Sequence, residues 1–118
     1  MHDEQRRHPR VLCVLPVRII VRGRYQLLET LTKNISLGGL KCLTPAEKPV
    51  GTPVSIEIGL GMRQEPLFSQ GRIMWMERVP YSEQFYIGVE FDQLSPRNST
   101  LLSVYLEQIS QTPHKSPA

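Results

Sequence analysis

Hydrophobic and polar residues alternate with a period of two along much of the chain. The clearest case is residues 54–60, where Val54, Ile56 and Ile58 fall on one face and the residues between them are polar. Alternation of this kind is typical of a strand that buries one face. Similar short runs, bounded by glycine, proline and polar turn residues, cover 16–23, 25–36, 38–44, 54–60, 67–79 and 85–91. The pattern therefore predicts six short strands.

Three details qualify this pattern. The leucines of run 25–36 also fit one face of a helix, so periodicity leaves a helix open there. Gly71 indicates a bulge in run 67–79, and Gly88 indicates a close approach or a barrel corner in the last run. Trp75 is expected to pack in the core or at its mouth.

Residues 95–110 change to helical spacing. Ser95 is a suitable N-cap and Pro96 suits the first helical position. The apolar stripe of this predicted helix consists of Leu101, Leu102, Tyr105, Leu106 and Ile109. Such a stripe must cover another surface, either the end of the strand assembly or a second copy of the chain. We therefore expect a monomer or a homodimer.

Short strands with tight turns, followed by one helix, predict a mainly β fold of the barrel or sandwich type. The 118 residues are enough for one domain with its own core. Neither a signal sequence nor an apolar run of membrane-spanning length is present, so a cytoplasmic location without membrane insertion is expected. The two cysteines lack zinc-ligand spacing and the three histidines lie near the chain ends, so no metal site is expected.

Arginines are concentrated at the start of the chain. Arg6, Arg7 and Arg10 fall within "QRRHPR", although the net charge of the chain is only +3. Charge alone favours a solvated tail, and an anion site is the alternative. Pro9 disfavours helical geometry in the residue before it, so the segment is expected to be extended. Arg6 and Arg10 would then stand roughly 13 Å apart.

A second polar group follows about two dozen residues later, in "NISLGG". Strand periodicity places the side chains of Asn34 and Ser36 on one face. Their amide and hydroxyl groups could read a base edge, and Gly39 would let a ligand or a second backbone approach. As a bare pattern, these residues also describe an ordinary turn.

The two motifs together, RxxxR followed by NxSxxG, resemble the PilZ domain family of bacterial cyclic di-GMP receptors. "GRIMWME" and "YIGVEF" also resemble later strands of that family. The resemblance implies a six-stranded antiparallel β-barrel with a C-terminal helix. It further implies cyclic di-GMP as the ligand, no cofactor, and a part in motility or biofilm signalling.

Carried over to this sequence, the resemblance assigns Arg6 and Arg10 to the phosphates and guanine edges, with support from Arg7. Asn34 and Ser36 would hydrogen-bond a guanine, and Gly39 would keep the turn open for the base. Arginine suits this ligand because its planar guanidinium binds phosphate bidentately and stacks on bases.

The expected organisation is a flexible N-terminal arm at residues 1–10, a barrel with its helix at 11–110, and a disordered tail at 111–118. The arm is expected to fold down on the ligand and to signal to a downstream protein partner.

Two other functions remain open. The chain could be a PilZ-like adaptor that binds proteins without the nucleotide, or a small basic barrel that binds single-stranded nucleic acid. The nucleic-acid alternative is less favoured, because the aromatic residues fall outside the arginine-rich segment. DNA binding is not expected, because a net charge of +3 is only mildly basic. Enzymatic activity is not expected either, because the sequence offers neither a nucleophile–base pair nor a phosphate-binding loop.

Overall fold

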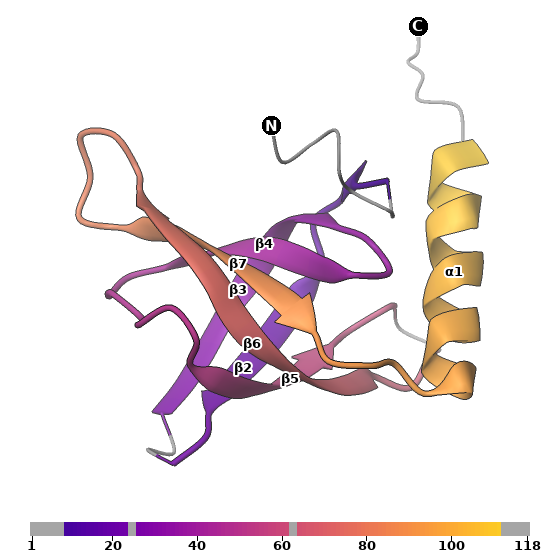
Figure 1. The fold of residues 1–118 in the computed structure, drawn as a ribbon. Coiled ribbons are helices and arrows are strands. Elements are labelled where there is room, and N and C mark those ends of the chain that lie inside the picture. The colour runs from indigo at the N-terminus through magenta and orange to yellow at the C-terminus, as the bar shows by residue number, and fades with distance from the viewer. Residues whose placement is uncertain (1–8, 24–25, 62–63, 112–118) are drawn as a thin grey trace, which may run out of the picture.

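The computed structural model describes residues 9–23, 26–61 and 64–111. These residues form seven strands and one helix (Figure 1). The elements are β1 (Val11–Leu12), β2 (Pro16–Val21), β3 (Gln26–Ile35), β4 (Gly39–Thr44), β5 (Pro53–Ile58), β6 (Leu67–Arg78), β7 (Phe85–Phe91) and α1 (Pro96–Gln111). The six strands and the helix that the sequence predicts are confirmed, and residues 26–35 form a strand, not a helix.

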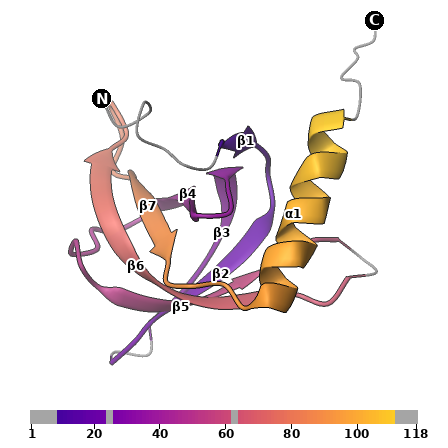
Figure 2. The same ribbon diagram turned by 45° about the vertical axis from the view of Figure 1, so that its right-hand side comes forward.

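The strands close into an antiparallel barrel. The sheet order is β1-β3-β2-β5-β6-β7-β4, and β4 pairs back onto β3. Strands β2 to β7 therefore form the predicted six-stranded barrel, whose strands curve around a common interior (Figure 2). Strand β1 is an addition to the six. It pairs with the last two residues of β3, along the same edge of β3 that pairs with β2 nearer its start. Its two residues are too few for periodicity to reveal.

Alternate residues of each barrel strand point inward and form the core. In β2, for example, Val17, Ile19 and Val21 are buried and the residues between them are exposed. Burial of such side chains stabilises the fold by about 1.5–3 kcal/mol each. The outward-facing residues of the same strands therefore remain available to carry a site.

Strand β6 contains a bulge at Met74, not at Gly71. Ile73 pairs with Val89 whereas Trp75 pairs with Gly88, so Met74 is the extra residue. The bulge changes which residues face outward. As a result, Trp75 lies on the outer face of the barrel and outside the core; of the two places expected for it, the core is wrong.

Helix α1 packs on one side of the barrel (Figures 1 and 2). Its start is capped as expected, because the Ser95 Oγ accepts a hydrogen bond from the Asn98 backbone N–H at 3.1 Å. Leu102 and Leu106 are buried against the core, and α1 contacts β6. The helix thus covers its own barrel. Within the described ranges, no helix has the length and hydropathy needed to cross a membrane.

Candidate functional site

Arg10 of the first motif and Asn34 of the second meet on the outer face of the barrel. Arg10, directly before β1, donates a hydrogen bond from Nη1 to the Asn34 Oδ1 at 2.6 Å. This contact spans 24 residues of sequence and arises because β1 pairs with the end of β3, with Leu12 opposite Asn34. Arg10 is half-buried, so it is held against the barrel and is not part of a solvated tail.

Thr32 fixes the connection between β1 and β2, and with it the position of Arg10. Its buried hydroxyl donates to the Cys13 carbonyl at 2.6 Å and accepts from the Leu15 backbone N–H at 2.9 Å. One side chain therefore satisfies both backbone groups where the chain passes from β1 to β2. Sequence reasoning missed this residue, because a threonine in a strand carries no signal of such a role.

Ser36 closes the turn between β3 and β4. Its hydroxyl accepts from the Gly38 backbone N–H at 3.0 Å, and its own backbone N–H donates to the Gly39 carbonyl at 2.8 Å. The side chain is only 4% exposed. In this structure the hydroxyl thus holds the turn that follows Asn34.

Gly39 lies in β4, opposite Glu90 of β7. A Cβ at this position would lie 3.1 Å from the Glu90 Cα and closer still to the Val89 carbonyl oxygen. The reason for glycine here is therefore the approach of a second backbone, one of the two alternatives that the sequence left open. The other two predicted site residues, Arg6 and Arg7, lie outside the described residues.

A row of outward-facing residues continues from Asn34 across three further strands. Asn34 pairs with Lys41 of β4, Lys41 with Gly88 of β7, and Gly88 with Trp75 of β6. Since neighbouring strands lie about 4.8 Å apart, the row spans roughly 14 Å. Its length suits a dinucleotide.

The indole of Trp75 rests on the backbone of β7 at Gly88. A Cβ on Gly88 would lie within 2.7 Å of the Trp75 Cζ2 and closer still to Nε1 and Cε2. Glycine thus provides the space that the indole occupies, while the side chain remains half-buried. An aromatic ring held in this way on an outer surface is suited to stacking on a planar base.

Comparison with known proteins identifies the family of the chain. The family model described as PilZ domain matches residues 4–108. The chain belongs to the PilZ domain family. No curated protein sequence matches the chain.

Solved structures share the PilZ fold. The inhibitor of motility MotI/DgrA of Bacillus subtilis is 20% identical, with a TM-score of 0.76 over 92% of this chain and 53% of that protein. The PilZ domain of YcgR from Escherichia coli with c-di-GMP is 20% identical, with a TM-score of 0.70 over 91% of this chain and 95% of that domain. YcgR from Escherichia coli in complex with c-di-GMP is 19% identical, with a TM-score of 0.75 over 91% of this chain and 46% of that protein. The chain therefore spans about half the length of MotI/DgrA and YcgR.

In this PilZ domain, the segment between β1 and β2 also contacts α1. The Cys13 thiol and the Tyr105 hydroxyl of α1 lie close enough to influence each other's pKa. Burial raises the pKa of Cys13, and burial together with the nearby thiol raises the pKa of Tyr105. Both groups therefore remain protonated at neutral pH, and both side chains pack against the core, so the segment after Arg10 lies beside the helix.

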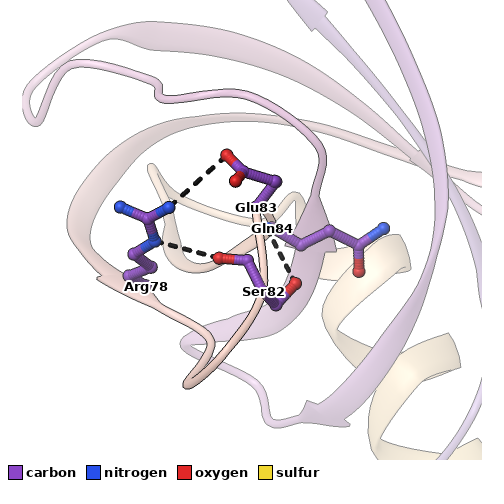
Figure 3. A network of polar contacts seen from close by, with 4 residues as sticks. All are labelled: Arg78, Ser82, Glu83 and Gln84. Carbon is purple, nitrogen blue, oxygen red and sulfur yellow. Dashed lines mark hydrogen bonds and ion pairs between the residues drawn. The ribbon is translucent and has the colours of Figure 1, made fainter.

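A separate cleft lies at the β6–β7 hairpin. It has a volume of about 460 Å³ and is lined by Arg78, Tyr81, Ser82 and Glu83. Arg78 donates from Nε to the Ser82 carbonyl at 2.9 Å and pairs with Glu83 at 3.4 Å (Figure 3). Because this guanidinium already has a carboxylate partner, the cleft is a weaker candidate for a phosphate than the face that carries Arg10.

The described residues contain no group of three His, Cys, Asp or Glu side chains placed to hold a metal. The outer face instead provides a cation, amide groups and aromatic rings. This chemistry is suited to binding an anionic nucleotide.

Proposed function

We propose that this PilZ domain is a receptor for cyclic di-GMP. The observation that carries the proposal is the contact between Arg10 and Asn34, which joins the two motifs at one place. With its Oδ1 accepting from Arg10, the Asn34 amide can direct its N–H groups toward an acceptor on a guanine. The c-di-GMP complexes of YcgR, which share the fold, support the choice of ligand.

In this proposal, Arg6, Arg7 and Arg10 bind phosphate and guanine edges, and Asn34 reads one base. Ser36 and Gly39 shape the β3–β4 turn that positions Asn34. Trp75 provides a stacking surface at the far end of the outer row. Stacking of a base on an aromatic side chain contributes about 1–3 kcal/mol.

We further propose that the receptor acts by binding and not by catalysis, in the cytoplasm. Ligand binding would order the N-terminal arm, and the change would reach a protein partner through β1 and α1. The proximity of Cys13 to Tyr105 supports this route, because it brings the segment after Arg10 beside the helix.

Titration calorimetry tests the proposal. The wild-type chain should bind cyclic di-GMP, and Arg10→Ala should weaken binding by about tenfold or more, since a charge-assisted hydrogen bond contributes about 1.5–3 kcal/mol. Arg97→Ala is the matched control, because Arg97 is an exposed arginine that pairs with Glu65 near the start of α1. Unchanged affinity in Arg10→Ala would contradict the assignment. Absence of binding to the wild type, with a partner retained regardless of nucleotide, would favour the adaptor alternative.

A further inference from the structure

Two lysines converge on one aromatic ring beside the proposed site. The Lys41 Nζ lies 4.4 Å from the centre of the Tyr86 ring and 5.8 Å from that of Trp75. The Lys33 Nζ lies 5.9 Å from the same Tyr86 ring. Two ammonium groups from neighbouring strands therefore lie within about 6 Å of the centre of the same ring on the outer face.

A bulge in β3 is what brings Lys33 to this surface. Thr32 pairs with Cys42 and Asn34 with Lys41, so Lys33 is the extra residue between them. In a regular strand, one of two consecutive residues would face the core. Here both Lys33 and Asn34 face outward, whereas Thr32 and Ile35 on either side are buried. Bulges often re-aim a side chain toward a functional surface in this way.

The charges of these lysines are not balanced by neighbours. Within the part of the chain that the structure describes, neither ammonium has a carboxylate within ion-pair distance, whereas Arg18 on the same barrel pairs with Glu29 and Glu57. Each contact with a ring contributes only about 0.5–1 kcal/mol at an exposed site. An anion placed between the two ammonium groups would relieve their repulsion and form charge-assisted hydrogen bonds.

We propose that Lys33 and Lys41 form an anion subsite that takes a phosphate of the bound nucleotide; this proposal rests on the proposed function. Asn34 lies between two cationic groups, with Arg10 on the β1 side and Lys41 on the β4 side. A ligand whose base stacks on Trp75 and whose other end reaches Arg10 must pass over Lys41. On binding, the Lys41 ammonium leaves the Trp75 ring to the base and turns to the phosphate.

Calorimetry with cyclic di-GMP at about 50 mM and about 300 mM salt tests the subsite, since exposed charge pairs are screened at the higher concentration. The double variant Lys33→Gln/Lys41→Gln should bind about tenfold or more weakly than the wild type at low salt, with a smaller loss of affinity on adding salt. Lys48→Gln/Arg97→Gln removes the same charge elsewhere and should bind like the wild type.

The possible results separate the two proposals. A wild type that binds, together with a lysine double variant of equal affinity at both salt concentrations, overturns the subsite and leaves the receptor intact. A wild type that does not bind contradicts the receptor, and the subsite with it. Because neither lysine is buried, the double variant should melt within a few degrees of the wild type. If the double variant melts at a much lower temperature, each single variant is measured instead, and each should show a smaller loss of affinity for cyclic di-GMP than the double variant would.

Discussion

The fit of Trp75 over Gly88 yields a sharp prediction for Gly88→Ala. The added methyl carbon would lie 2.7 Å from the Trp75 Cζ2 and closer to two other indole atoms, whereas ordinary contact begins at 3.4 Å. The ring must therefore move outward by 0.7 Å or more. Gly88 faces outward, so the core should remain intact while the indole moves away from the backbone of β7.

This displacement should lower both the stability of the domain and its affinity for cyclic di-GMP. Overpacking of this kind costs about 1–3 kcal/mol, so the free energy of unfolding should fall by about that amount. Loss of one stacked base costs a further 1–3 kcal/mol of binding, roughly a fivefold to 150-fold weaker affinity for cyclic di-GMP.

Chemical denaturation and tryptophan emission measure these changes. Trp75 is the single tryptophan of the chain, so its emission reports on this site alone. The emission maximum of Gly88→Ala should shift to longer wavelength as the ring becomes more exposed. In a Trp75→Leu background, the smaller side chain should tolerate the methyl group, so Gly88→Ala should lower the free energy of unfolding much less than in the wild type. Unchanged emission and stability in Gly88→Ala would refute the assigned contact.

Three further predictions concern the scaffold. Thr32→Val leaves the Cys13 carbonyl and the Leu15 N–H without their partner, so the free energy of unfolding should fall by about 2–4 kcal/mol; a loss below 0.5 kcal/mol in a denaturant titration would contradict this role. Leu102→Ala should cost about 2–5 kcal/mol if α1 packs on the barrel, and equal melting temperatures would contradict that packing. Burial raises the pKa of Cys42 from 9.0 to about 12, so the folded state keeps the thiol protonated and stability should fall from pH 9 to pH 12 by about 1.4 kcal/mol per pH unit. Cys42→Val should lose that part of the alkaline dependence; the same pH profile in both chains would contradict it.

Most of the fold could be predicted because its strands bury alternate residues. The run from Val54 to Ile58 reads as a strand since its three inward residues are all β-branched and apolar. Strand β1 could not be predicted, because two residues show no period and it forms only by pairing with β3. The bulge at Met74 was likewise hidden, since it depends on the register with β7 and not on a glycine.

The candidate site was predictable where a motif carries it. Arg10 and Asn34 were both named from the sequence, and the structure brings them into contact. Trp75 was missed because it faces outward only through the bulge in β6. Lys41 faces outward by simple alternation in β4, but its place between Asn34 and Trp75 depends on the pairing of four strands. Side chains from distant strands meet through register, which a single sequence does not display.

An NMR titration of the isotope-labelled chain with cyclic di-GMP tests binding and location together. We expect the amide signals of Arg10, Asn34 and Lys41 and the indole N–H signal of Trp75 to shift in a saturable manner. Signals of the hairpin residues Arg78 and Ser82, which belong to the separate cleft, should not move. Shifts confined to that hairpin, or no shifts at saturating ligand, would contradict a cyclic di-GMP site on the face that carries Arg10 and Asn34.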